Sequence, residues 1–206
     1  MMKVPAHTKT FSCYHDRRFD REAIKLLPGD YFACGGEEML VTVLGSCISV
    51  CLYESKLKIG GMNHFMLPSA QHNKGSLVLQ NTHSARYGNV AMEWLINDII
   101  KLGGSRENLS AKIFGGGRVI PALVDIGKLN IDFVKQYCQI EEIPVVSADV
   151  GGLCARKLYY IPRNNQAYVK TITSMHNTTI DERESQYRQQ LELTKAHKNV
   201  FLFEDE

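Results

Sequence analysis

The sequence contains no uninterrupted apolar run that approaches the roughly 20 residues needed to span a bilayer. The first 20 residues carry charges and two histidines, and they lack the apolar stretch of a secretory signal peptide. An excess of one charge is missing too, because 24 Lys and Arg residues oppose 22 Asp and Glu residues. A general nucleic-acid binder usually has a strong basic excess. The sequence therefore predicts a cytoplasmic protein with no membrane insertion and no nucleic-acid partner.

Cysteine pairs with the spacing of a zinc site are also lacking. The six cysteines include no Cys-x-x-Cys, and the pair Cys47 and Cys51 has no second pair near it. In a reducing compartment these cysteines should be free thiols. A chain of 206 residues, 44% of them hydrophobic, is long enough to bury a core by itself. We therefore expect one domain that is held together by neither metal nor disulfides.

Turn signals and hydrophobic patterns divide the chain into three parts. Residues 1–27 are polar and precede a Pro-Gly-Asp turn, so they are interpreted as an N-terminal arm. Residues 28–175 hold most of the strand and helix patterns. Residues 176–206 are charged but carry one apolar stripe, which predicts a surface helix followed by an acidic tail.

Strand patterns outnumber helical patterns in the central part. Apolar residues at helical spacing predict helices over 90–102 and 126–139. Runs of β-type residues bounded by Gly or Pro predict strands over 31–34, 39–44, 47–53, 58–67, 111–114, 143–150, 157–161 and 167–172. Residues 69–84 are polar and rich in Ser, Asn and His, which predicts a loop. The elements do not follow a strict βαβ alternation. We expect an α+β fold, a single-domain α/β sandwich with mixed or antiparallel sheets, hairpins and few helices.

Two residues, Cys47 and His64, are candidates for catalysis. Cys47 follows a Gly-Ser turn between two apolar strands, and His64 lies on a predicted strand that has two glycines at its entrance. Converging backbone N–H groups at a turn can stabilise a thiolate, and a nearby histidine can take and return its proton. A free cysteine is, however, most often a small buried hydrophobe, and a lone histidine on a strand is more often structural. The spacing alone leaves both interpretations open.

The glycine run Gly115-Gly116-Gly117 follows a predicted strand and suggests a phosphate cradle as another possibility. The run completes no Gly-x-Gly-x-x-Gly, no Gly-Lys-Ser/Thr follows it, and Pro121 interrupts any helix behind it. The run is more typical of turn geometry than of nucleotide binding.

Several motifs, taken in order, resemble one family, the chemoreceptor glutamine deamidases of bacterial chemotaxis, CheD. The motifs are Leu44-Gly-Ser-Cys47, Gly60-Gly-Met-Asn-His-Phe-Met-Leu-Pro68, Arg86-Tyr-Gly88, Ala111-Lys-Ile-Phe-Gly-Gly116 and Asp149-Val-Gly-Gly152 with Arg156-Lys157. They extend over roughly residues 28–172. Each motif is common by itself, whereas the ordered set is specific.

The resemblance implies a cysteine hydrolase with protein-glutamine glutaminase activity. Such an enzyme converts glutamine side chains on the cytoplasmic helices of methyl-accepting chemotaxis receptors to glutamate and ammonia. By the resemblance, Cys47 is the nucleophile that forms a thioester, His64 is the acid and base, and neither a metal nor an organic cofactor is used. Some members also act on glutamate methyl esters. In some species the family binds a CheY-phosphate phosphatase, CheC, which competes with receptors.

One position departs from the family pattern. The family has a hydroxyl residue six places before the cysteine, where this chain has Val41, and Thr42 follows one residue later. Because successive side chains on a strand point to opposite faces, the family's register would turn Val41 toward the site. A β-bulge would instead bring Thr42 inward. We expect Thr42 to be the third catalytic residue, because Val41 offers no polar group.

Further site residues are expected around this pair. The expected oxyanion and substrate pocket consists of Gly45, Ser46, Gly60, Gly61 and Asn63. A basic rim that attracts Glu- and Gln-rich receptor helices is expected from Arg86, Arg156 and Lys157. Ordinary solvated surface charge is the competing interpretation of that rim.

Two other function classes remain open at this point. The chain can be a different thiol acyltransferase, such as a transglutaminase or a protease. It can also be a non-catalytic binding module on the same scaffold that sequesters a signalling partner such as a CheC-type phosphatase. Ammonia release without an added amine separates the deamidase from both, and a Cys47 thiol inert to iodoacetamide would favour the binding module.

Overall fold

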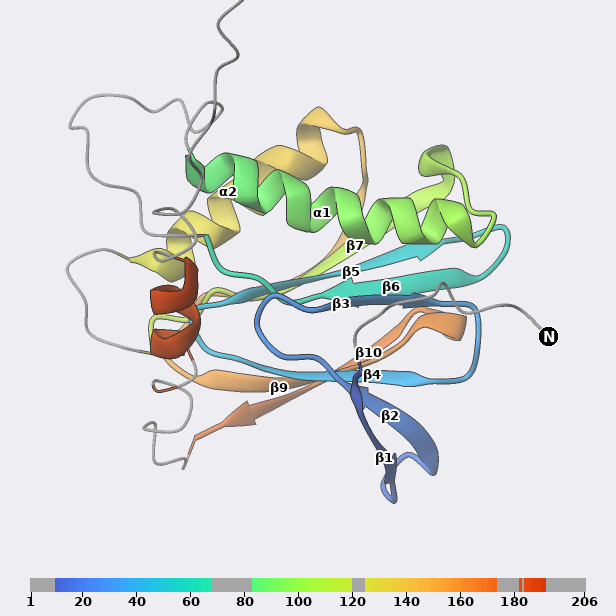
Figure 1. The fold of residues 1–206 in the computed structure, drawn as a ribbon, viewed down its shortest axis with the longest axis horizontal. Coiled ribbons are helices and arrows are strands. Elements are labelled where there is room, and N and C mark those ends of the chain that lie inside the picture. Colours follow the sequence, from blue (N-terminus) through green and yellow to red (C-terminus); the bar gives the residue numbers. More distant parts are fainter. Residues whose placement is uncertain (1–9, 68–82, 120–124, 174–181, 183, 192–206) are drawn as a thin grey trace, which may run out of the picture.

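The computed structural model describes residues 10–67, 83–119, 125–173, 182 and 184–191. Within these residues, ten strands form two sheets that pack face to face, and α1 and α2 cover the outer face of one sheet (Figure 1). The first sheet has the order β1 (Ser12–Asp16), β2 (Arg21–Lys25), β4 (Met39–Leu44), β9 (Ala155–Ile161) and β10 (Gln166–Ile172). The second has the order β3 (Tyr31–Cys34), β6 (Ile59–Asn63), β5 (Ile48–Glu54), β7 (Leu109–Gly115) and β8 (Val145–Val150).

The helices α1 (His83–Lys101) and α2 (Ile126–Ile140) lie against the second sheet. Short 3₁₀ turns occupy Arg106–Asn108 and Pro162–Asn164. Residues 184–191 form one more helix, called the C-terminal helix below. Most strand pairs are antiparallel, whereas β2 with β4 and β7 with β8 are parallel. The predicted α+β sandwich with mixed sheets, hairpins and few helices is therefore confirmed.

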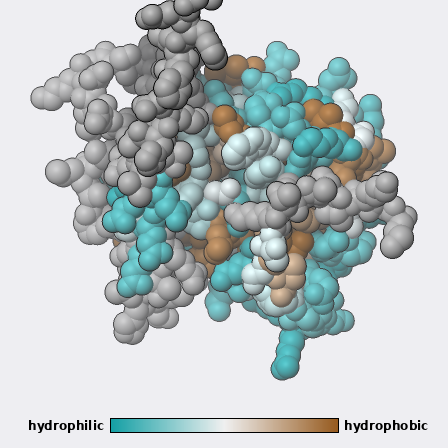
Figure 2. Space-filling model, viewed as in Figure 1, coloured by the Kyte–Doolittle hydropathy of each residue, from teal (hydrophilic) through white to brown (hydrophobic). Residues whose placement is uncertain are grey.

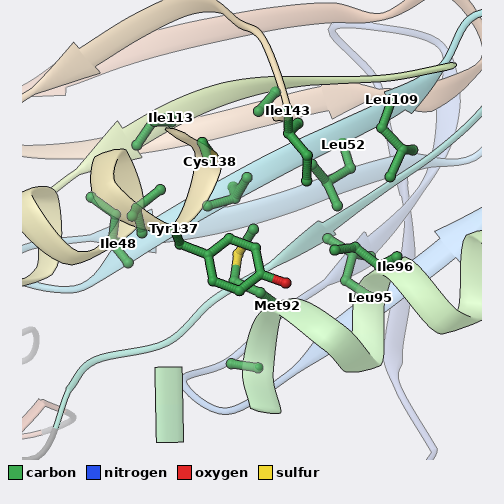
Figure 3. Close-up of a cluster of buried hydrophobic side chains, with 14 of the residues drawn as sticks. Ile48, Leu52, Met92, Leu95, Ile96, Leu109, Ile113, Tyr137, Cys138 and Ile143 are labelled. Atoms are coloured by element: carbon green, nitrogen blue, oxygen red, sulfur yellow. The ribbon is translucent and has the colours of Figure 1, made fainter. Parts of the chain in front are cut away.

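Alternation along β5 shows how the sequence builds two separate cores. Ile48, Val50 and Leu52 point toward α1 and α2, where they join one buried cluster. Figure 3 shows side chains of β5 and β7 meeting those of the two helices in this cluster. Cys51, which lies between Val50 and Leu52, and Cys47, which directly precedes the strand, belong to a second cluster. Side chains on opposite faces of one strand thus fill two different layers.

The second cluster lies between the two sheets. It contains Leu40 and Leu44 of β4, Leu158 of β9 and Met62 of β6, all of them fully buried. This layer also receives Tyr187 and Leu191 of the C-terminal helix, which are 9% and 8% exposed. The expected surface helix in residues 176–206 therefore buries one side in the sandwich, in agreement with its apolar stripe. The predicted acidic tail lies outside the described residues.

The expected polar arm over residues 1–27 is wrong for the part that the structure describes. Residues 12–16 and 21–25 form β1 and β2, which pair with each other, and β2 also pairs with β4. Ala23 and Ile24 are buried, and Leu26 reaches the core between the sheets. The prediction failed because β1 is an edge strand. Its side chains are largely exposed, so its composition is as polar as that of an arm.

Other predicted elements differ at their ends. The helix predicted from residue 90 begins at His83, inside the stretch 69–84 that was expected to be a loop. The strand predicted over 58–67 ends at Asn63, and the chain then meets β5 again through an isolated bridge between Ile48 and Phe65. The rest of the expected loop, residues 69–82, lies outside the described residues.

Hydrophobic residues are distributed as separate patches on the face drawn in Figure 2, among larger hydrophilic areas. Of the helices in the described ranges, none combines the length and the apolar composition needed to cross a membrane.

Candidate active site

The turn that carries Cys47 is held through its carbonyl groups. The Gly45 carbonyl accepts a hydrogen bond from the Gly117 N–H at 2.8 Å, and the Cys47 carbonyl accepts one from the Gly116 N–H at 2.7 Å. The Ser46 carbonyl between them accepts from Asn130 Nδ2 at 2.7 Å. Because each peptide unit is planar, a fixed carbonyl also fixes the N–H of the next residue on the opposite side.

The N–H groups of this turn converge on one carboxylate. Glu184 of the C-terminal helix accepts hydrogen bonds from the backbone N–H groups of Gly45, Ser46 and Cys47 at 3.1, 3.2 and 3.2 Å. The Ser46 hydroxyl donates to the same carboxylate at 2.5 Å. Successive N–H groups that point inward form an anion-binding concavity of the kind that stabilises an oxyanion. The turn therefore provides a ready-made anion site beside the thiol.

Cys47 is completely buried in this arrangement. Burial raises the pKa of its thiol, and the Glu184 carboxylate, which accepts a hydrogen bond from the thiol, raises it further. The charge of Arg188 acts in the opposite direction. With Glu184 in place, the thiol is therefore protonated at neutral pH.

His64 is joined to Thr42 across the two sheets. Nδ1 of His64 lies 2.7 Å from the Thr42 hydroxyl, which in turn donates its proton to the Leu26 carbonyl at 2.8 Å. The hydroxyl has only one proton, so the bond to His64 requires a proton on Nδ1. Thr42 thus fixes the tautomer that leaves the lone pair on Nε2.

Thr42 reaches His64 without a β-bulge. The register of β4 against β9 is uninterrupted from Leu40 to Leu44. Thr42 shares its face of β4 with Leu40 and Leu44, which fill the layer between the sheets, whereas Val41 lies in a third cluster on the outer face. The register expected from the family, with Val41 facing the site, is therefore not the one in this chain.

The second nitrogen of His64 is available for proton transfer. Nε2 is buried and has no hydrogen-bond partner among the described residues. Burial lowers the pKa of His64 to about 3, so the imidazole is neutral at physiological pH. The bridge between Ile48 and Phe65 puts Cys47 and His64 on the same face of their two strands, as diagonal neighbours. A neutral base and a thiol thus share the layer between the sheets.

A pocket of about 510 Å³ connects the protein surface with His64 and Glu184. Its lining includes Thr42, His64 and Glu184, together with Lys157 and Tyr14 at its sides. Cys47 does not line this pocket. The pocket gives access to the histidine and to the carboxylate that covers the cysteine.

Three residues expected in the substrate pocket have packing roles instead. A side chain at Gly60 would come within 2.9 Å of the Leu52 carbonyl, and one at Gly61 within 2.5 Å of the Phe32 carbonyl. Asn63 points toward α1, where its amide accepts from the Val50 N–H at 2.8 Å and donates to the Ala91 carbonyl. Gly60, Gly61 and Asn63 thus hold the second sheet together, whereas Gly45 and Ser46 lie at the cysteine.

The structure does not bring Arg86, Arg156 and Lys157 together as the expected basic rim. The Arg156 side chain is buried, and its guanidinium binds the Asp149 carboxylate at 2.9 Å and the Gly151 carbonyl. Arg156 is therefore wrong as a receptor contact, because its charge is neutralised within the β8–β9 connection. Lys157 lines the pocket, and its ammonium lies 4.8 Å from the ring centre of Tyr159. Arg86 belongs to α1, but its side chain lies outside the described residues.

Asn130 and Glu184 are the site residues that the sequence analysis did not predict. Asn130 is fully buried and bridges the Ser46 carbonyl and the Leu67 N–H. Each residue carried a signal, because each is a polar side chain at a position where the helical pattern calls for an apolar one. A polar side chain on such a buried face is often there because it forms a hydrogen bond with another buried polar group.

Comparison with known proteins shows the family to which the chain belongs. Residues 66–171 match the family model described as CheD chemotactic sensory transduction. A relative from Shewanella oneidensis named "Probable chemoreceptor glutamine deamidase CheD 1" is 48% identical over 192 residues, which cover 92% of each chain. Proteins named "Probable chemoreceptor glutamine deamidase CheD" from Laribacter hongkongensis and Janthinobacterium sp. are 46% and 43% identical, again over 92% of this chain and 92% and 93% of theirs. This chain belongs to the CheD family.

Proposed function

We propose that this chain hydrolyses the side-chain amide of glutamine residues on the cytoplasmic helices of chemotaxis receptors, giving glutamate and ammonia. The observation that carries the proposal is the turn at Cys47, whose three N–H groups converge on a carboxylate. A carboxylate of a glutamate side chain is also the product of this reaction. The names of the relatives give the same activity and the same receptor substrate.

The reaction begins with transfer of the thiol proton. Nε2 of His64 takes the proton of Cys47, and the thiolate attacks the carbon of the glutamine amide. The amide oxygen becomes an oxyanion, which the N–H groups of Gly45, Ser46 and Cys47 stabilise. One such donor contributes roughly 3 kcal/mol to stabilisation of the transition state.

The second half of the reaction reverses the proton path. His64, now an imidazolium, protonates the departing nitrogen, so that ammonia leaves and a thioester joins Cys47 to the substrate. His64 then removes a proton from water, and the hydroxide attacks the thioester to release the glutamate side chain. Thr42 holds Nδ1 throughout, so Nε2 faces the reacting atoms in both halves.

The proposal places the protein in the cytoplasm, where the modified helices of the receptors lie, with no membrane insertion of its own. Lys25 and Lys157 both line the pocket and can attract an acidic receptor helix. A CheC-type phosphatase remains a possible partner. Its binding surface would overlap the receptor site if the two compete.

Mass spectrometry of a treated receptor tests the proposal. A purified receptor cytoplasmic fragment is incubated with the protein, and its peptides are searched for glutamines that become about 1 Da heavier, the change expected when an amide becomes an acid. The buffer contains no added amine. A transglutaminase would join part of the glutamines to receptor lysines or, in a parallel reaction, to an added primary amine, and a binding module would leave all glutamines unchanged.

A further inference from the structure

The C-terminal helix covers the nucleophile of its own chain. Glu184 is 3% exposed and accepts hydrogen bonds from Gly45, Ser46 and Cys47, more than 130 residues away in the sequence. All three donors of the anion site are thereby occupied. A substrate amide has no open donor to bind while Glu184 is there.

Neighbouring side chains anchor this helix. Tyr187 packs against Gly29, where even a Cβ atom would lie within 3.1 Å of the tyrosine ring, and its hydroxyl forms a hydrogen bond with Tyr87 of α1. Leu191 enters the core between the sheets. The anchors lie one and two helical turns beyond Glu184, so they hold its carboxylate at the turn.

We propose that the C-terminal helix is an intramolecular product mimic that inhibits the enzyme until a receptor helix displaces it. The proposal rests on the proposed function for the identity of the displacing ligand. A glutamate side chain presented from a helix has the chemistry of the reaction product, a glutamate on a receptor helix. It occupies the donors in the place expected for that product.

The buried state of Cys47 gives the second support. The thiol is completely buried, and Glu184, but not Cys47, lines the 510 Å³ pocket. A glutamine side chain that enters from outside reaches the sulfur only after Glu184 leaves. Burial raises the pKa of the thiol and the same carboxylate raises it further, so departure of Glu184 both opens the site and favours the thiolate.

Alkylation of Cys47 by iodoacetamide tests this inference without any receptor. The full chain and its Glu184→Ala variant are treated with the reagent, and the modification of each cysteine is followed by peptide mass spectrometry. Glu184→Ala should increase the rate at Cys47 by about tenfold or more, because a thiol must be accessible and ionised to react. The exposed Cys13 serves as an internal standard whose rate should not change.

Two further variants serve as control and second test. Glu182→Ala removes an exposed carboxylate two residues from Glu184 and should react like the unaltered chain. Tyr187→Ala detaches the helix but leaves Glu184 in the sequence, and it should also increase the rate at Cys47. The melting temperature of each variant shows whether the rest of the fold is retained.

Failure of this inference is distinguishable from failure of the proposed function. If Cys47 reacts no faster in Glu184→Ala and Tyr187→Ala than in the folded, unaltered chain, the helix is not a barrier and the inference is wrong. If Cys47 becomes reactive but neither the unaltered chain nor Glu184→Ala deamidates a receptor, the helix is confirmed as a barrier and the deamidase function is wrong. An inert thiol in the unaltered chain alone therefore does not indicate a binding module.

Discussion

The Thr42 hydroxyl and Nδ1 of His64 lie 2.7 Å apart and join the two sheets of the sandwich. Thr42 comes from β4 of the first sheet, and His64 directly follows β6 of the second. The Leu26 carbonyl accepts the hydroxyl proton and so determines the direction of the hydrogen bonds. The orientation of the base thus depends on the packing of one sheet on the other.

Substitution of the threonine should weaken catalysis in part. Thr42→Val removes one hydrogen bond to the base, worth about 1 kcal/mol, so kcat should fall by roughly fivefold. Thr42→Ser keeps the hydroxyl and should retain most of the activity. The measurement is the rate of ammonia release at saturating receptor fragment.

Val41 provides the matched control for this strand. Its side chain is buried on the outer face of the first sheet, next to Met39 and Tyr159. Val41→Thr should therefore give no gain in turnover. Full activity in Thr42→Val together with increased activity in Val41→Thr would show that β4 has the opposite register.

Loss of the base should have a larger effect. His64→Ala should lower turnover by roughly 10²- to 10⁴-fold, because both half-reactions need proton transfer. The competing bases are His72, which lies outside the described residues, and His83 at the start of α1. Near-normal turnover of His64→Ala at every pH would assign the base to one of these residues.

The buried His64 should also make stability depend on pH. Its pKa is about 3 in the folded chain and about 6.5 in an unfolded one. Between these values the unfolded chain binds more protons, so the free energy of unfolding decreases as the pH falls below 6.5. From pH 6.5 to pH 5 this histidine should remove about 2 kcal/mol.

Urea denaturation at pH 7 and pH 5 measures this contribution. His64→Gln should lose stability less steeply than the unaltered chain over this interval, because glutamine does not titrate. Equal slopes in the two proteins would show that His64 titrates near its ordinary pKa and is not buried as described.

The amide of Asn130 should act through the Cys47 turn. Asn130→Asp keeps an oxygen that accepts from Leu67 but loses the donor to the Ser46 carbonyl. We expect kcat to fall by about tenfold or more with little change in KM, since one hydrogen bond that orients the Cys47 N–H is lost and a buried carbonyl is left unpaired. A change confined to KM would assign Asn130 to substrate binding instead.

An amide placed at position 184 should become a substrate of its own chain. In Glu184→Gln the side chain is held at the turn, and Cys47 should hydrolyse it to the original carboxylate. The peptide containing position 184 should become about 1 Da heavier with time, and it should not do so when Cys47→Ala is combined with Glu184→Gln. An amide that persists in both proteins would contradict the placement of this side chain at the reacting atoms.

Regular patterns made much of the fold predictable. The strand over 39–44 and the helix from Ile126 follow from alternating or helical apolar residues, and the structure has both. The strands β1 and β2 were missed because few of their side chains are buried. The pairing of β2 with β4 forms only when the sandwich folds as a whole, so local composition does not predict it.

The site was predictable where residues lie close in sequence. Gly45 and Ser46 precede Cys47, and the structure places their N–H groups together with that of the cysteine. The polar residue Glu184 on an apolar stripe was a signal, but its partner was not predictable, because a contact across 137 residues arises only from the docking of the C-terminal helix. The role of Cys47 as the nucleophile stays a prediction, which two cysteine variants test.

The most direct measurement compares ammonia release by Cys47→Ala and Cys51→Ala. Both thiols are completely buried in the layer between the sheets, only four residues apart, so the second is a matched control for packing. The account predicts that Cys47→Ala releases no ammonia from a receptor cytoplasmic fragment and that Cys51→Ala releases it at a rate close to that of the unaltered chain. An active Cys47→Ala, or an inactive but folded Cys51→Ala beside it, would contradict the assignment of the nucleophile.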